Sequence, residues 1–168
     1  MQGTPDMVQS PDQFAAAFGA IISEQREQAS LLLTILASER TALNAGDLSA
    51  MDAASVEKVA VLGAMEQLKT RADELLVDTP FASSDAPVEQ ALSWCDTSGN
   101  LRAARDDVAR LMSECDLENR RNGLVVQHRL NYVRRAIDIL HAAHEETMTY
   151  GADGIARSGG SSRLLAEG

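Results

Sequence analysis

Apolar residues recur at helical spacing along most of the chain. Between Phe14 and Leu43 they are separated mostly by three or four residues, which is the pattern of an amphipathic helix. Ser10-Pro11-Asp12-Gln13 predicts where this helix begins, because serine can cap, proline suits the first helical position and glutamine can complete a capping box. Gly46, placed for a left-handed C-cap, predicts where it ends.

A second stripe with the same spacing runs from Leu48 to Leu76, and Asp47 can cap the helix that it predicts. The link from Asn44 to Asp47 is short, so the first two helices should lie antiparallel as a hairpin. Residues 78–85 contain proline and small polar residues that extend a helix poorly, and they are expected to form a loop.

A short helix is predicted from Asp85-Ala-Pro87 through Cys95, with Trp94 as the side chain that anchors it to the bundle. Residues 96–100 follow. We expect a break or a strong kink there, because Gly99 is costly inside a helix and its polar neighbours can cap one.

The longest predicted helix runs from Leu101 to Tyr150 and carries two apolar stripes that are out of phase by one residue. At about 1.5 Å per residue it would span roughly 75 Å, so part of it is expected to extend past the other helices and to need a partner. The phase shift falls on residues 119–123, as in the skips that locally rewind a coiled-coil seam. The first stripe is Leu101, Ala104, Val108, Leu111, Met112 and Cys115, and the second is Val126, Leu130, Val133, Ile137, Leu140 and His144.

Two asparagines, Asn119 and Asn122, lie at this phase shift beside Gly123. They could set the helix register, as a single buried asparagine does in coiled coils. They could also lie on a solvated face, or form a polar notch in a partner-binding surface. The sequence leaves these three interpretations open.

The composition supports an all-helical fold and excludes several partners. Of 168 residues, 45% are hydrophobic and only 4% aromatic, which suits packed helices better than a β-sandwich. The net charge of −10 argues against binding nucleic acid or an anionic membrane surface. No apolar run is long enough for a transmembrane helix, no signal peptide is expected, and Cys95 and Cys115 are expected to be reduced thiols of a cytoplasmic protein.

Residues 151–168 contain five glycines and three serines, and they are expected to be disordered without a partner. Their only sizeable apolar residues are Ile155, Leu164 and Leu165. The chain therefore divides into a flexible N-terminus (1–9), a helical bundle (10–150) and a flexible partner-binding tail (151–168).

No motif for catalysis or for a cofactor is present. The chain has no P-loop, no GxGxxG and no nucleophile elbow. Asp138 and His141 share one helix face, but carboxylate-bridged metal bundles need two such pairs and further glutamates, so these side chains are expected to be solvated. We expect no enzyme activity, no metal and no cofactor.

Three segments stand out by their order and spacing. The turn Ala42-Leu43-Asn-Ala-Gly46-Asp47-Leu48 leads into Lys58-x-x-x-Leu62 and Leu68-x-x-x-Ala72. Asn119-Arg-Arg-Asn122-Gly123-Leu124 contains an N-x-x-N-G pattern, and Thr149-Tyr150-Gly151-Ala-Asp153-Gly154 contains a Y-G-x-x-G pattern. In their order and spacing these motifs, which cover roughly residues 30–154, resemble those of the FlgN family of flagellar export chaperones.

The resemblance implies a cytoplasmic chaperone without ATPase activity. Such a protein would hold an unassembled hook–filament junction protein by its C-terminal helices and deliver it to the type III export gate. The aliphatic stripe from Val126 to Leu140 would then be a clamp for the client, with Asn119, Asn122 and Gly123 before it. Tyr150, Ile155, Leu164 and Leu165 would complete the clamp.

The predicted fold is all-α: an elongated antiparallel bundle of three long helices, one short helix and a disordered tail. Three readings of function remain open. The first is the export chaperone; the second is a coiled-coil adaptor or scaffold with no export role; the third is a metal-dependent helical-bundle enzyme. The residues do not say whether the stripe from Val126 to Leu140 binds a client, is core, or pairs with itself in a homodimer.

Overall fold

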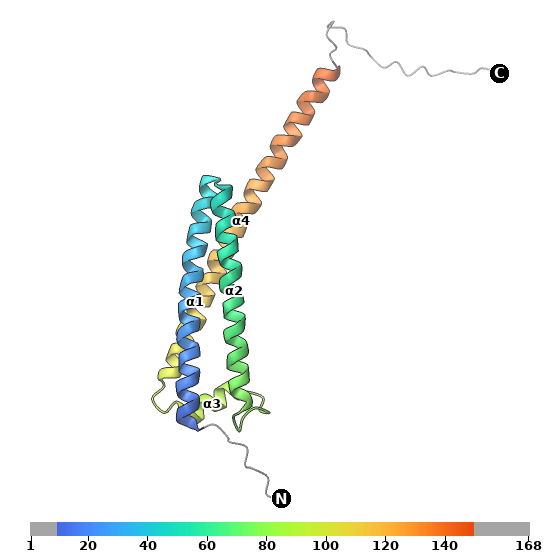
Figure 1. The fold of residues 1–168 in the computed structure, drawn as a ribbon. Helices are drawn as coiled ribbons and strands as arrows, with labels where there is room; N and C mark the ends of the chain where they lie inside the picture. The colour runs from blue at the N-terminus through green and yellow to red at the C-terminus, as the bar shows by residue number, and fades with distance from the viewer. Residues whose placement is uncertain (1–9, 150–168) are drawn as a thin grey trace, which may run out of the picture. The chain divides into compact units, whose positions relative to one another are not determined.

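The computed structural model describes the backbone of residues 10–149 and the side chains of residues 10–141. Within that range the chain forms four helices and no strand: α1 (Pro11–Ala45), α2 (Leu48–Val77), α3 (Pro87–Cys95) and α4 (Asn100–Thr149) (Figure 1). This confirms the all-α fold with three long helices and one short one. The chain divides into two compact units after Val125, and each is described by itself below.

The predicted caps delimit the first hairpin. Ser10 Oγ accepts a hydrogen bond from Gln13 N at 3.3 Å, and Gln13 Oε1 accepts one from Ser10 N at 3.2 Å, so the capping box is complete. Gly46 has a φ of 73°, in the left-handed region that favours glycine, and its N–H donates to the last carbonyls of α1. Asp47 Oδ1 then accepts from Ala50 N at 3.0 Å and starts α2. Local chemistry alone is therefore sufficient to define this turn.

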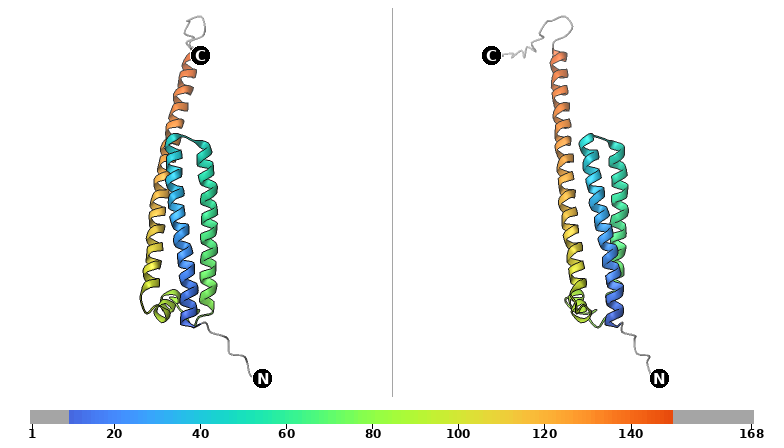
Figure 2. Two further views of the ribbon diagram at one scale, coloured as in Figure 1. Left: turned by 60° about the vertical axis from the view of Figure 1, so that its left-hand side comes forward. Right: turned by 90° about the vertical axis from the view of Figure 1, so that its left-hand side faces the viewer.

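Helices α1 and α2 lie side by side and antiparallel in every view (Figures 1 and 2). The part of α4 before Val126 runs along α1, where Cys115 Sγ lies 3.4 Å from the Ala29 carbonyl oxygen. Close packing is visible at Gly19, where an added Cβ would lie 3.1 Å from a methyl carbon of Leu101. The core of this unit is thus built on α1, which contacts both neighbours.

Two apolar clusters fill the unit that ends at Val125. The first joins α1, α2, α3 and α4, and the second lies further along α1 toward the α1–α2 turn. Burial of these side chains is the main term that stabilises the bundle. The buried members of the first are Phe14, Phe18, Ile22, Leu76, Ala91, Leu92 and Val108, and those of the second are Leu32, Ile35, Leu36, Ala54, Val61 and Cys115.

Helix α3 is held to the first cluster by aromatic contacts. The ring of Trp94 lies 6.3 Å from Phe14 and 5.8 Å from Phe81, centroid to centroid, in the tilted and edge-on geometries that aromatic pairs favour. Glu89 of α3 forms ion pairs with Arg102 at 3.2 Å and Arg105 at 2.5 Å on α4. Trp94 is therefore a packing anchor, as its sequence context suggests.

The helical conformation is interrupted between α3 and α4, as predicted. Gly99 has a φ of 76°, a conformation that L-residues with a side chain rarely adopt. Asp96 Oδ2 accepts a hydrogen bond from Arg102 N at 2.9 Å, and this backbone N–H holds the pKa of Asp96 below its usual value. The capping carboxylate and the glycine together end one helix and start the next.

Helix α4 continues without interruption through Gly123 to Thr149. Nothing lies within 4 Å of a Cβ added at Gly123, so this glycine is not required by close packing. Tyr150 and residues 151–168, which carry the rest of the predicted clamp, lie outside the described residues.

Candidate partner-binding surfaces

Asn122 is buried and fully engaged inside the bundle. Only 2% of this residue's surface is exposed to solvent. Asn122 Nδ2 donates to the Leu36 carbonyl oxygen at 2.9 Å and to Glu39 Oε2 at 2.8 Å, while Oδ1 accepts from Arg40 Nε at 3.2 Å. All three partners lie on α1, so the amide ties α4 to α1 at one position along both helices.

The charged partners of Asn122 extend this contact into a network across three helices. Glu39 Oε1 accepts from Lys58 Nζ of α2 at 2.6 Å. Arg40 pairs with Glu118 of α4, and Glu118 also pairs with Arg121 at 2.6 Å. Because the side chains of Glu39 and Glu118 are only 13% and 22% exposed, these pairs are less screened by water than surface pairs.

The two asparagines at the phase shift have different environments. Val108, Cys115 and Asn122 are spaced by seven residues and all three are buried, so Asn122 continues the seam that faces α1. Asn119 is exposed and lines a groove instead. The structure therefore buries Asn122 against α1 and does not place it in an exposed notch, and its role in setting the register stays a prediction.

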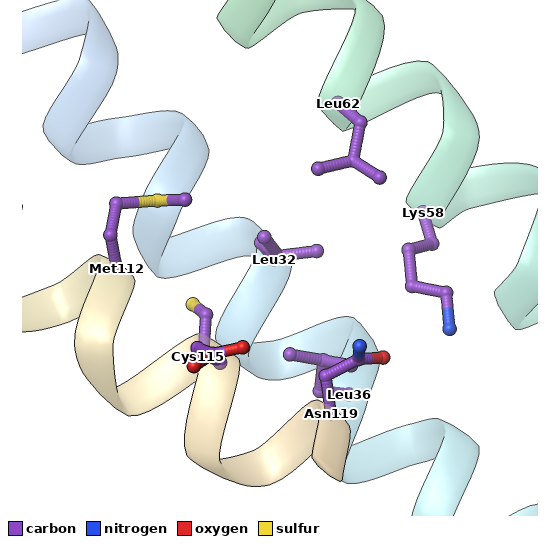
Figure 3. A pocket seen from close by; sticks show the side chains of 8 residues that line it. Leu32, Leu36, Lys58, Leu62, Met112, Cys115 and Asn119 are labelled. Carbon is purple, nitrogen blue, oxygen red and sulfur yellow. The ribbon is translucent and has the colours of Figure 1, made fainter. Parts of the chain in front are cut away.

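A groove of about 350 Å³ lies between α2 and α4, above α1 (Figure 3). Leu32 and Leu36 of α1, Leu62 of α2 and Met112 of α4 form its apolar lining. A volume of this size can take a few aliphatic side chains but not a whole helix. The remaining lining residues are Lys58 of α2 and Cys115, Asp116 and Asn119 of α4.

The groove has no arrangement suited to catalysis. The two charged side chains in its wall are already paired, Lys58 with Glu39 and Asp116 with Arg120 at 2.5 Å. Burial raises the pKa of the Cys115 thiol, which disfavours the reactive thiolate. The groove is therefore an apolar contact surface, and the chemistry of its lining gives it no nucleophile.

The predicted clamp stripe lies on the second unit and is exposed to solvent. Relative exposures are 39% for Val126, 51% for Leu130, 52% for Val133, 45% for Ile137 and 67% for Leu140. Their alternating spacing of four and three residues keeps them on one face of α4. Gly123, one step before Val126 in this series, is also exposed.

Apart from Asn122 in the network and Asn119 in the groove, the residues of these two features were not selected as site residues from the sequence. Glu39, Arg40, Lys58 and Glu118 look like ordinary solvated charges on amphipathic helices. A signal for Asn122 did exist, since it is seven residues after Cys115 and so continues the first stripe. Nothing in the sequence pointed to its partners, which are 82 to 86 residues away.

Two further properties concern metals and membranes. Among the residues whose side chains are described, no three His, Cys, Asp or Glu gather closely enough to hold a metal ion. None of the helices, as far as they are described, has the length and apolar character needed to cross a bilayer.

Comparison with known proteins gives a match to a protein family. A family model described as FlgN protein matches residues 14–158, which is most of the chain. No curated protein and no solved structure matches. The matched range includes α1 from Phe14 onward, the whole of α2, α3 and α4, and both surfaces described above.

Proposed function

Since the chain belongs to the FlgN family of flagellar export chaperones, whose members bind hook-associated proteins, we propose that it holds the C-terminal helical region of an unassembled hook-associated protein. In this proposal the protein acts in the cytoplasm, prevents premature assembly and delivers its client to the type III export gate. The family is a chaperone family and not an enzymatic one, so the work is done by binding alone.

The exposed stripe from Val126 to Leu140 is the observation that carries the proposal. Contiguous exposed apolar residues usually mark an interaction site on a soluble protein. A heptad-spaced stripe on a helix is also the surface that an amphipathic helix recognises, because its own apolar residues fit between those of the partner. The stripe thus suits a helical client better than a folded globular one.

Masking such a client has a clear physical purpose. The terminal helix of a subunit that polymerises must have an apolar face, and this face would aggregate if it were exposed before assembly. Covering it with a matching stripe prevents that, and the contact can still be reversed at the export gate. Tyr150, Ile155, Leu164 and Leu165 would extend the contact in the part of the chain that the structure does not describe.

Ile137→Asp is expected to weaken client binding by at least about tenfold, because it puts a charge into the apolar contact. Ile139→Asp is the matched control: Ile139 is 69% exposed and lies two residues along the same helix, off the stripe. Binding would be measured by calorimetry with a synthetic peptide of the C-terminal helix of a hook-associated protein. Circular dichroism should show equal helix content for both variants. Equal affinities of the two variants would contradict the proposed clamp, and a wild-type protein that ignores the peptide would favour the adaptor reading.

Removal of residues 151–168 is expected to weaken the same complex while the helix content and the unfolding of the bundle stay unchanged. The sequence predicts that this tail orders only on binding; such a segment contributes contacts but also loses entropy, so a moderate loss of affinity is expected. A second variant, Leu164→Ser/Leu165→Ser in the full chain, separates the loss of apolar contacts from the loss of length. Unchanged affinity for both variants would exclude the tail from the binding surface.

A further inference from the structure

The positions on either side of the exposed stripe carry basic residues and no acidic ones. In heptad terms Leu130 and Ile137 are at a, while Val126, Val133 and Leu140 are at d. The flanking e positions are then Gln127, Arg134 and His141, and the g positions are Arg129 and Ala136. Asp138, the one carboxylate between residues 126 and 141, lies at b, away from the stripe.

This local charge is opposite in sign to that of the whole chain. Residues 126–141 contain three arginines and one aspartate, a formal charge of +2 in a chain of −10. Arg134 is exposed and forms no ion pair with any other side chain that the structure describes. The edge of the stripe therefore offers positive charge to whatever covers it.

The helix pairs within the bundle show how this chain matches charges across an interface. Glu24 of α1 pairs with Arg71 of α2 at 2.7 Å, and Glu39 pairs with Lys58 at 2.6 Å. On α4, Glu118 pairs with Arg40 of α1. Each of these three pairs sets an acidic side chain of one long helix against a basic side chain of another, as flanking positions do in coiled coils.

A second copy of this chain would not bring acidic residues to the basic edges of the stripe. A parallel pair would place Arg129 at g opposite Arg134 at e of the partner helix, twice over by symmetry. An antiparallel pair would bring no carboxylate to either edge between residues 126 and 141. Like charges at these positions repel, so the stripe is poorly suited to a homodimer.

We propose that the occupant of this stripe is an amphipathic helix with acidic residues beside its apolar seam, and that Arg134 is a specificity-determining contact for it. The inference rests on the proposed client-binding function and adds the charge of the client helix. Such pairs lie at the rim of the contact, so they act mainly on partner choice and association rate, and they weaken with salt.

The test uses synthetic helical peptides with the apolar pattern of a hook-associated C-terminal helix and either Glu or Lys at every flanking position. The full chain is expected to bind the Glu peptide roughly tenfold more tightly than the Lys peptide at low salt, and the difference should shrink at high salt. Arg134→Glu should weaken binding of the Glu peptide about fivefold and strengthen binding of the Lys peptide. Arg135→Glu makes the same charge change one residue away, at f on the back of the helix, and should have less than about a twofold effect.

The possible outcomes distinguish the acidic-client inference from the proposed chaperone function on which it rests. Equal binding of the two peptides, or equal effects of Arg134→Glu and Arg135→Glu, would overturn the acidic-client inference and leave the chaperone proposal standing. If neither these peptides nor the natural client peptide binds, the proposed function fails and the inference fails with it. Sedimentation showing a wild-type dimer that Ile137→Asp dissociates would overturn it in favour of a second copy.

Discussion

Replacing Asn122 with alanine is expected to lower the free energy of unfolding by about 1–3 kcal/mol, the cost of leaving buried polar groups unsatisfied. The amide makes three hydrogen bonds to α1, and its loss removes a partner from Glu39 and from Arg40, neither of which is fully exposed. Asn119→Ala is the matched control, because Asn119 is exposed and should change stability by less than about 0.5 kcal/mol. Urea unfolding followed by circular dichroism would measure both.

Asn122→Leu separates the stability of this contact from its specificity. A leucine supplies apolar area but cannot satisfy the α1 groups, and loss of a buried asparagine often lets helices shift register or associate. We therefore expect Asn122→Leu to alter helix alignment or oligomeric state, visible by small-angle scattering, while the chain stays helical. A variant that keeps both the stability and the scattering profile of the wild type would show that the network does not set register.

Phe14→Ala is expected to be the most destabilising single change, by about 3–5 kcal/mol, the range for truncating a buried aromatic residue. Phe14 is 0% exposed and belongs to the first cluster. Its ring lies 5.2 Å from that of Phe18, centroid to centroid, and also contacts the ring of Trp94 on α3. Its removal would leave a cavity in the cluster that joins α1, α2, α3 and α4. Trp94 is the only tryptophan, so its fluorescence reports directly on whether α3 stays packed.

Phe81→Ala is the control for this second prediction. Phe81 also contacts the Trp94 ring, but it is half-buried in the loop before α3, so its truncation should cost clearly less than that of Phe14. Thermal unfolding by fluorescence and by circular dichroism would compare the two. Equal losses of stability would mean that the first cluster depends on Trp94 and not on the buried face of α1.

The stability variants change residues before Val126, on α1, on α4 and in the loop before α3, whereas the binding variants change residues of α4 after it. Asn122 is the last buried residue of α4 among those with described side chains, and the stripe that follows is exposed. The two kinds of variant should therefore have different effects. Asn122→Ala should mainly lower the free energy of unfolding, whereas Ile137→Asp or Arg134→Glu should mainly lower the affinity for the client peptide. Residues far apart without shared partners usually have additive effects.

The helices and their ends could be predicted because the signals are local. A capping box, a left-handed glycine and a proline at the first helical position each act within a few residues, and Ser10, Gly46 and Pro87 all lie where these rules place them. The break at Gly99 follows from the same kind of reasoning. In the unit that ends at Val125 the apolar stripes predicted most of the buried positions, whereas the second stripe of α4 is exposed.

The candidate site could be predicted only in part. The stripe from Val126 to Leu140 can be recognised from its spacing. Spacing does not show whether it is buried or exposed, because both kinds of stripe have the same spacing. Its basic edges are legible too, once the heptad register is known. The groove beside Leu62 and the partners of Asn122 could not be predicted. They depend on how three separate helices are aligned along their axes.

The four helices, their caps, the antiparallel first hairpin and the family to which the chain belongs could all be predicted from the sequence. The surroundings of the two asparagines could not, because they depend on the fold. Asn122 is bonded to α1 and Asn119 faces solvent, although both lie on the same segment and only three residues apart. The physical reason is that a helix repeats every 3.6 residues, so neighbours on one helix can face different surroundings, and those surroundings come from parts of the chain more than 80 residues away.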